Sequence, residues 1–202
     1  MSMNTFNVRG NTMNRSRLIG SVSAAALAMG LMASAASAQT VIANGANATV
    51  TTITDGQTIS VDPNGISTVA GAPVVIINND DVSLTVANGA TLASTGISQT
   101  VQINPAADRA LVTVGTTGRL RGDSRVVQVG GMGNRLNNAG SILGTGNQRN
   151  GTVFADVTAQ GFNLNNMIGG VIDAGLGNLG AGFSAELSAA GNAFTIVNAG
   201  TI

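Results

Sequence analysis

The sequence contains no cysteine, histidine, tryptophan or tyrosine. Without histidine or cysteine, the chain cannot form a Ser-His-Asp or Cys-His catalytic arrangement, and it offers no imidazole or thiolate ligand to a metal ion. It also cannot form a disulfide framework. We therefore predict that the chain is not an enzyme, and we expect it to bind no cofactor and no metal.

Aromatic and charged residues are scarce as well, at 2 % and 9 % of the 202 residues, whereas 28 residues are glycine. A core must therefore come from aliphatic and small side chains. A solenoid, in which the chain coils into stacked turns, can stabilise such a composition because each turn buries one face against the next. The same composition is less suited to a compact globular core, because the sequence lacks large aromatic side chains.

The first 38 residues have the pattern of a secretory signal peptide. Three arginines precede a stretch of apolar and small residues from Leu18 to Met32, and Ala36-Ser37-Ala38 fits the small-residue rule for cleavage. We predict cleavage between Ala38 and Gln39, and export of the chain that follows. A membrane anchor from Leu18 to Ala35 is the alternative, but the many Ala, Ser and Gly residues of this stretch make it a poor one.

Removal of the leader changes the net charge. All nine basic residues are arginines, and three of them lie in the leader. The six that remain face nine acidic residues, so residues 39–202 carry a net charge of 6 − 9 = −3. Nucleic acids and acidic membrane surfaces select proteins with basic patches. We therefore expect no nucleic-acid partner.

Segments of similar sequence recur at intervals of thirty residues. They are Asn138-Ala139-Gly140-Ser141-Ile142, Ile168-Gly169-Gly170-Val171-Ile172 and Asn198-Ala199-Gly200-Thr201-Ile202. The same shift superimposes Val127, Val157 and Leu187. Self-similarity at a fixed period indicates a repeat architecture.

Half of this period also produces a series of nine aliphatic residues: Val82, Ile97, Val112, Val127, Ile142, Val157, Ile172, Leu187 and Ile202. Short apolar strands give such a pattern if each turn of a solenoid returns the same position to one interior column. We therefore predict an all-β fold, a parallel β-helix or β-solenoid with short strands and Gly- and Asn-rich corners. The periodicity leaves open whether thirty residues form one large turn or two small ones.

The predicted domain organisation has three parts. Residues 1–38 form the signal peptide, residues 39–81 an N-terminal cap with irregular strands, and residues 82–202 the solenoid repeats, with a period of about 30 residues and no closing cap. The cap is assigned to 39–81 because its alternation is less regular and because terminal repeats of stacked architectures are usually atypical.

Two polar features fit the same architecture. Asn138 and Asn198 are expected to stack in an amide ladder along the solenoid. Asp80-Asp81 is the one acidic pair, and its side chains would point to opposite faces of an extended segment. A turn after Asn78-Asn79 is the favoured interpretation.

A glycine-rich segment near the C-terminus is the strongest competitor to the solenoid. It contains a G-x-G-x-x-G motif made of Gly175, Gly177 and Gly180. With its flanks, over 171–202, it resembles the first βαβ unit of flavin- or nicotinamide-binding Rossmann domains and requires a helix over 181–191. The alternative is disfavoured because Asn198 stands where that family places a ribose-binding acid. We therefore assign no cofactor to these glycines.

Two short motifs suggest binding sites. Arg121-Gly122-Asp123 matches the tripeptide that integrin-binding adhesins display on loops, and the alternative is a solvated turn between Leu120 and Val126. Gly130 to Leu136 resembles a calcium-binding nonapeptide of repeat-in-toxin proteins. Calcium requires aspartate oxygens there, and Arg135 stands in the place of one, so a Gly-rich corner is favoured.

The leader, followed by cysteine-free repeats with Asn-Ala-Gly-Ser-Ile and Asn-Ala-Gly-Thr-Ile, resembles the passenger region of autotransporters, the type V secretion proteins of Gram-negative bacteria. The resemblance covers the leader and residues 82–202. It implies a β-helical passenger that a C-terminal translocator β-barrel carries to the cell surface, the outer membrane or the medium.

From this resemblance we expect the chain to be the N-terminal portion of a longer protein. The role that it implies is a structural stalk and adhesin with a host or cell-surface ligand. The alternative is a carbohydrate-active β-helix enzyme whose catalytic residues lie beyond Ile202.

Overall fold

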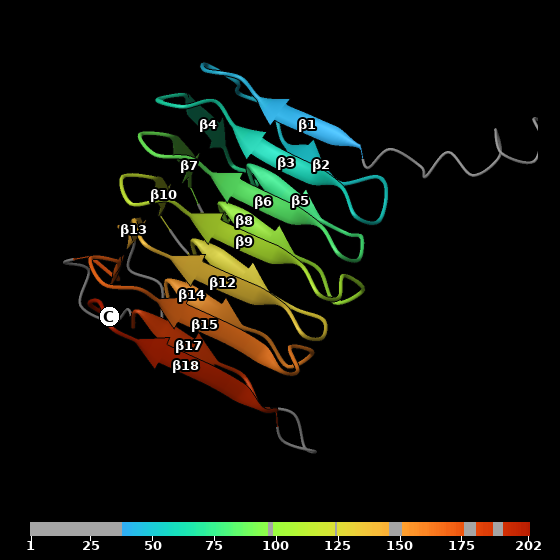
Figure 1. The fold of residues 1–202 in the computed structure, drawn as a ribbon, viewed down its shortest axis with the longest axis vertical. Coiled ribbons are helices and arrows are strands. Elements are labelled where there is room, and N and C mark those ends of the chain that lie inside the picture. Colours follow the sequence, from blue (N-terminus) through green and yellow to red (C-terminus); the bar gives the residue numbers. More distant parts are fainter. Residues whose placement is uncertain (1–37, 97–98, 124, 146–150, 176–180, 188–191) are drawn as a thin grey trace, which may run out of the picture. The chain divides into compact units, whose positions relative to one another are not determined.

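The computed structural model describes residues 38–96, 99–123, 125–145, 151–175, 181–187 and 192–202. These residues contain parallel strands and no helix (Figure 1). The predicted all-β parallel solenoid is therefore confirmed. The predicted leader lies outside the described residues, apart from Ala38.

The strands form three sheets, which we name A, B and C. Sheet A contains β1 (Gln39–Ile42), β3 (Thr58–Val61), β6 (Ser83–Val86), β9 (Leu111–Val114), β12 (Arg135–Asn138), β15 (Phe162–Asn166) and β18 (Phe194–Asn198). Sheet B contains β2 (Val50–Thr51), β5 (Val75–Ile77), β8 (Val101–Ile103), β11 (Val127–Val129), β14 (Val153–Ala155) and β17 (Phe183–Ala185). Sheet C contains β4 (Ile66–Ala70), β7 (Thr91–Thr95), β10 (Arg119–Gly122), β13 (Ser141–Gly144) and β16 (Val171–Asp173).

From β3 onward the chain visits sheets A, C and B in that order and then returns to sheet A, so three strands make one turn (Figure 1). Every named pairing joins a strand to the equivalent strand of the next turn. Residues 39–81, the predicted cap, form β1 to β5 of these same sheets. Their role as a cap stays a prediction.

The length of a turn varies along the solenoid. In sheet C, Ile66 pairs with Thr91 at a spacing of 25 residues (91 − 66), whereas Ser141 pairs with Val171 at a spacing of 30 (171 − 141). The period of about 30 therefore holds for the last turns only, and thirty residues form one large turn.

The predicted single column at intervals of fifteen is wrong. Val112, Val127 and Ile142 are buried, but they lie in sheets A, B and C respectively. Half a turn of a three-sided solenoid brings the chain to a different sheet, so the spacing does not return to the same column. Val157 and Leu187 of that series are exposed, by 46 % and 69 %.

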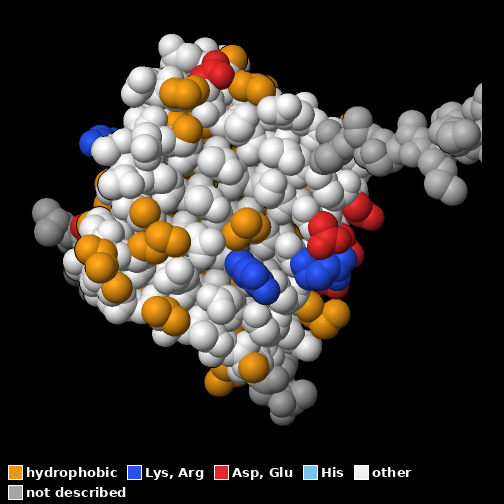
Figure 2. All heavy atoms as spheres, viewed as in Figure 1, with side chains coloured by type: hydrophobic (Ala, Val, Ile, Leu, Met, Phe, Trp, Pro, Cys, Tyr) orange, Lys and Arg blue, Asp and Glu red, His pale blue; other side chains and the backbone are white. Residues whose placement is uncertain are grey.

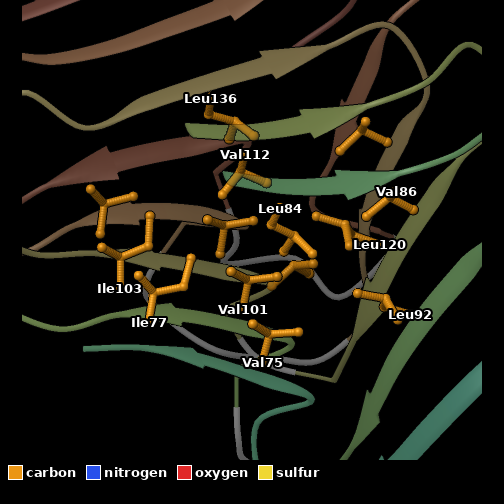
Figure 3. Packing of buried hydrophobic residues seen from close by; sticks show 14 of the residues in the cluster. Val75, Ile77, Leu84, Val86, Leu92, Val101, Ile103, Val112, Leu120 and Leu136 are labelled. Atoms are coloured by element: carbon orange, nitrogen blue, oxygen red, sulfur yellow. The ribbon is translucent and has the colours of Figure 1, made fainter. Parts of the chain in front are cut away.

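The core consists of inward-pointing side chains that stack from turn to turn (Figure 3). In sheet A, Leu84, Val112 and Leu136 are in register and at most 1 % exposed. In sheet C, Leu120 pairs with Leu92 on one side and Ile142 on the other. Burial of each such side chain contributes roughly 1.5–3 kcal/mol. Stacked aliphatic residues thus supply the core that the scarcity of aromatic residues requires.

Three asparagines form the predicted amide ladder, one more than expected, and Asn138 and Asn166 are buried whereas Asn198 is exposed. Asn138 donates a hydrogen bond through Nδ2 to Oδ1 of Asn166 (2.8 Å), and Asn166 donates in the same way to Asn198 (2.8 Å). The thirty-residue alignment placed Ile168 in this position, but Ile168 is 85 % exposed. The corner after Asn166 is two residues longer than the corner after Asn138, which explains the shift.

The pair Asp80-Asp81 lies in a turn, as predicted, with Asp81 at a φ of 56°. Asp80 also belongs to a series of corner carboxylates. Oδ1 of Asp55 accepts the backbone N–H of Asp80 (3.1 Å), and Oδ1 of Asp80 accepts the backbone N–H of Asp108 (2.9 Å). Side chains of one turn therefore satisfy the corner backbone of the next.

The nucleotide-binding alternative fails within the described residues. It requires a helix where β17 forms a strand, and β17 pairs in parallel with β14. Gly175 follows β16 at a corner with a φ of 72°, and Gly177 and Gly180 lie outside the described residues.

No helix long and apolar enough to span a membrane occurs in the part of the chain that the structure describes.

Candidate functional site

The outer face of sheet C carries the polar side chains that we assign to a candidate binding site. Strand β10 lies in the middle of this sheet, between β7 and β13. Its alternation buries Leu120 and Gly122 and turns Arg119 and Arg121 to solvent. Two guanidinium groups therefore project from the same face of one strand, as the two-residue period of a strand dictates.

The neighbouring strand β7 carries short side chains at the same heights. Thr91 pairs with Arg119, and Ala93 pairs with Arg121. Long side chains beside short ones leave a hollow of about 420 Å³ in the surface, which we call the sheet C groove. Its lining also includes Ile66 and Thr68 of β4, Thr95 of β7, and Asp123 and Thr145 at the adjacent corner.

Asp123 is held in place at one end of the groove. Its Oδ2 accepts the backbone N–H of Gly96 (2.8 Å), and its Oδ1 accepts the hydroxyl of Thr145 (2.8 Å). The hydrogen bond from Gly96 is the main cause that lowers the pKa of the Asp123 carboxyl, followed by the bond from Thr145 and the charge of Arg121. The carboxylate is thus ionised and oriented by neighbours on both adjacent turns.

The arginines of the groove differ from the arginine at the opposite corner of sheet A. Arg109 forms ion pairs with Asp80 (3.1 Å) and Asp81 (2.8 Å), and the hydrogen bond to Asp81 is the main cause that raises its pKa. Among the described residues, neither Arg119 nor Arg121 has an acidic side-chain oxygen within ion-pair distance. The groove therefore presents two cationic groups that are not neutralised by a direct ion pair.

The tripeptide Arg121-Gly122-Asp123 occupies an unusual place for a loop-displayed motif. Its first two residues belong to a strand that is paired on both sides, and Gly122 is buried. Both oxygens of Asp123 already accept a hydrogen bond. Recognition of this tripeptide by an adhesion receptor stays a prediction.

Sequence reasoning singled out Arg121 and Asp123 from the tripeptide but missed Arg119. The signal was present, because Arg119 and Arg121 flank an apolar residue at the period of a strand. The contribution of β4 and β7 could not be found in this way, since Thr91 and Arg119 pair across 28 residues (119 − 91) and the predicted period was 30.

The outer face of sheet B is polar, but its side chains contact one another. Gln99 donates to Oε1 of Gln128 (2.7 Å), and the guanidinium of Arg125 lies over the ring of Phe154, 4.1 Å from its centroid. This contact covers the outward-facing Phe154, which is only 3 % exposed. These side chains satisfy one another.

Few charged side chains are visible in the view of Figure 2, and most of them gather at the right of centre. A search of the described residues finds no cluster of acidic side chains that could hold a metal ion.

Comparison of the chain with protein-family models, curated proteins and solved structures found no match.

Proposed function

We propose that this chain is a surface-exposed or secreted structural stalk, the passenger of an autotransporter-like protein, and that it contributes to adhesion. The observation that carries the proposal is the continuous stack of three parallel sheets, in which every turn buries its core against the next. Such a coil extends along one axis and presents long lateral faces, as a stalk must.

The absence of cysteine suits export of this kind of fold. A chain without disulfides can cross a membrane pore unfolded and needs no oxidation step afterwards. Contacts in the solenoid join neighbouring turns, so folding can spread from one turn to the next as the chain emerges. Both properties agree with the autotransporter resemblance of the leader and repeats.

A binding role is better supported than hydrolysis. Glycoside hydrolysis normally requires two carboxyl groups on either side of the scissile bond. Among the described residues that line the sheet C groove, Asp123 is the one acid. We therefore assign recognition, and not catalysis, to this face.

Export is tested by fusing residues 1–202 to a reporter enzyme whose essential disulfides form only outside the cytoplasm of a Gram-negative host. The proposal expects reporter activity and a mature chain that begins at Gln39, determined by mass spectrometry. A fusion with Ala38→Arg is the matched control, because a large charged residue violates the cleavage rule and should leave the leader attached. An inactive reporter with an uncleaved leader in the unchanged fusion would contradict the proposal.

Surface exposure is tested in a cell that produces the full-length protein, by labelling intact cells with an antibody against residues 39–202. Labelling of intact cells supports the stalk. Labelling that occurs only after the cells are lysed would overturn it.

A further inference from the structure

We propose that the sheet C groove binds an acidic polysaccharide, as one extended chain that lies along β7. Arg119 and Arg121 contact the carboxylate or sulfate groups of the sugar units. The inference rests on the proposed function, in that it names the class of surface ligand to which the stalk would adhere.

Charge is the first argument. The guanidinium groups of Arg119 and Arg121 leave the same face of β10, and neither has an ion-pair partner among the described residues. Arginine binds carboxylate and sulfate-like oxyanions through two parallel N–H donors, which supplies both affinity and orientation. A separation of two positions along a strand corresponds to roughly 6.6 Å, so the two groups can contact two anionic substituents of a single chain.

Shape is the second argument. Neighbouring strands of a sheet lie ~4.8 Å apart, so β4 and β10, on either side of β7, are separated by roughly 10 Å. The groove between them holds about 420 Å³ and has a floor of short side chains. Ile66, which is 54 % exposed, forms the wall opposite the arginines and offers an apolar surface to the C–H face of a sugar ring. The hollow suits a single extended chain and not the face of a folded protein.

The lining also determines which sugars are accepted. It includes Thr68, Thr91 and Thr95, whose hydroxyls can donate to and accept from sugar hydroxyls, and none of the described residues that line it is aromatic. Neutral sugars gain much of their affinity from packing against aromatic rings, so they lose that contribution here. Anionic groups on the ligand are therefore required for binding.

The attraction is local. Residues 39–202 have a net charge of 6 − 9 = −3, so this part of the chain does not attract a polyanion over long distances. The Debye length is ~8 Å at physiological ionic strength, so the ligand responds mainly to the charges within the groove. Binding should consequently be of modest strength per site and should weaken as salt is added.

The test is isothermal titration of the purified 202-residue chain with short oligogalacturonate and with the same oligosaccharide in its methyl-esterified, uncharged form. Binding of the acidic form, weaker at high salt and at least tenfold stronger than binding of the ester, is expected. Binding of both forms with equal affinity, or of neither, overturns the inference.

Charge-removing variants locate the site. Arg119→Gln and Arg121→Gln should each weaken binding at least tenfold, because each substitution removes a charge-assisted hydrogen bond to the ligand. Arg135→Gln is the matched control, because Arg135 is an exposed arginine on the outer face of sheet A. An equal loss in Arg135→Gln would show that only overall charge matters and would overturn the inference.

The variant Asp123→Asn separates this ligand from an adhesion receptor that reads the tripeptide. Acidic oligosaccharide should bind Asp123→Asn as well as the unchanged chain, or more tightly, because a negative charge leaves the groove. A receptor that requires the Asp carboxylate would lose its binding. Lost oligosaccharide binding by a variant that keeps its unfolding temperature contradicts the proposed placement of the ligand.

The binding assay does not depend on export, and the surface-labelling assay does not depend on the oligosaccharide. Failure of oligosaccharide binding with intact labelling would remove the ligand and leave the stalk. Failure of labelling with intact oligosaccharide binding would remove the surface stalk and leave the ligand.

Discussion

Single polar side chains in this protein connect one turn of the solenoid to the next. Asp123 receives hydrogen bonds from Gly96 on the preceding turn and Thr145 on the following turn. Asn166 bonds to Asn138 and Asn198 in the same manner. Each of these residues therefore stabilises three turns at once, which makes its substitution informative.

The lowered pKa of Asp123 predicts how its contribution depends on pH. A carboxyl whose pKa is lower in the folded state than its value of 3.8 in the unfolded chain stabilises the fold at pH values above 3.8. This stabilisation is lost as the pH falls through the lower, folded pKa. We expect the unfolding free energies of the unchanged chain and of Asp123→Asn to differ at pH 6 and to converge as the pH falls below the folded pKa of Asp123.

Chemical denaturation at a series of pH values measures this difference. Because Asp123 is exposed to solvent, the difference should be small, about 1 kcal/mol or less. A difference that grows as the pH falls would contradict the assignment.

Removal of the central ladder amide should be costly. Asn166→Ala leaves the buried amide of Asn138 and the carbonyl of Gly170 with fewer partners, so we expect a loss of about 1–3 kcal/mol in the free energy of unfolding. Asn165→Ala is the control, since Asn165 directly precedes Asn166 in β15 and faces outward. Equal effects of the two substitutions in thermal denaturation would show that the ladder adds no stability.

Strands were more predictable from the sequence than the corners that join them. Period-two alternation of aliphatic and polar residues marks β6, β9 and β11, because one face of each strand must enter the core. The lengths of the corners cannot be predicted in this way. Pairing between turns constrains the register of the strands but not the length of the loop between them. Four residues connect Asn166 to Val171, whereas two residues connect the equivalent positions Asn138 and Ser141 on the preceding turn.

The same distinction explains the candidate site. Arg121 and Asp123 lie within one short segment and were recognised as a motif. The groove also needs β4 and β7, which come from two earlier turns, and only the observed register brings Thr91 and Ala93 beside the arginines. Motif matching within one strand cannot identify such neighbours.

Strand β10 should tolerate little change on its inner face. Leu120→Ala removes a fully buried side chain from the middle of the sheet C column and should cost about 2–5 kcal/mol. Leu143→Ala makes the same chemical change on the outer face of β13, where the side chain is only partly buried, and should cost less. Urea denaturation of the two variants measures the difference, and similar midpoints would mean that the column is not the core.

At the scale of the whole solenoid, stability in the isolated 202-residue chain should be highest in the middle turns. The strands β1 and β18 each have one partner in sheet A, whereas β9 has two. At the C-terminal edge, Ile196 is 45 % exposed, although Leu164, to which it is paired, is fully buried. The outer turns therefore lack contacts that the inner turns have.

Hydrogen exchange detected by mass spectrometry tests this gradient. Amides of β9 and β12 should exchange more slowly than those of β1 and β18, because the end turns open without disturbing the rest. Uniform protection along all turns would instead indicate a single all-or-none unit.

The direction of the hydrogen bonds between turns has a mechanical consequence. In every sheet these bonds connect successive turns and so run along the axis of the coil. A pulling force applied between the two ends would act along these hydrogen bonds and stretch them. The coil would then release its turns one after another, starting from the ends. We therefore expect a filament built in this way to lengthen in steps under tension, one turn at a time.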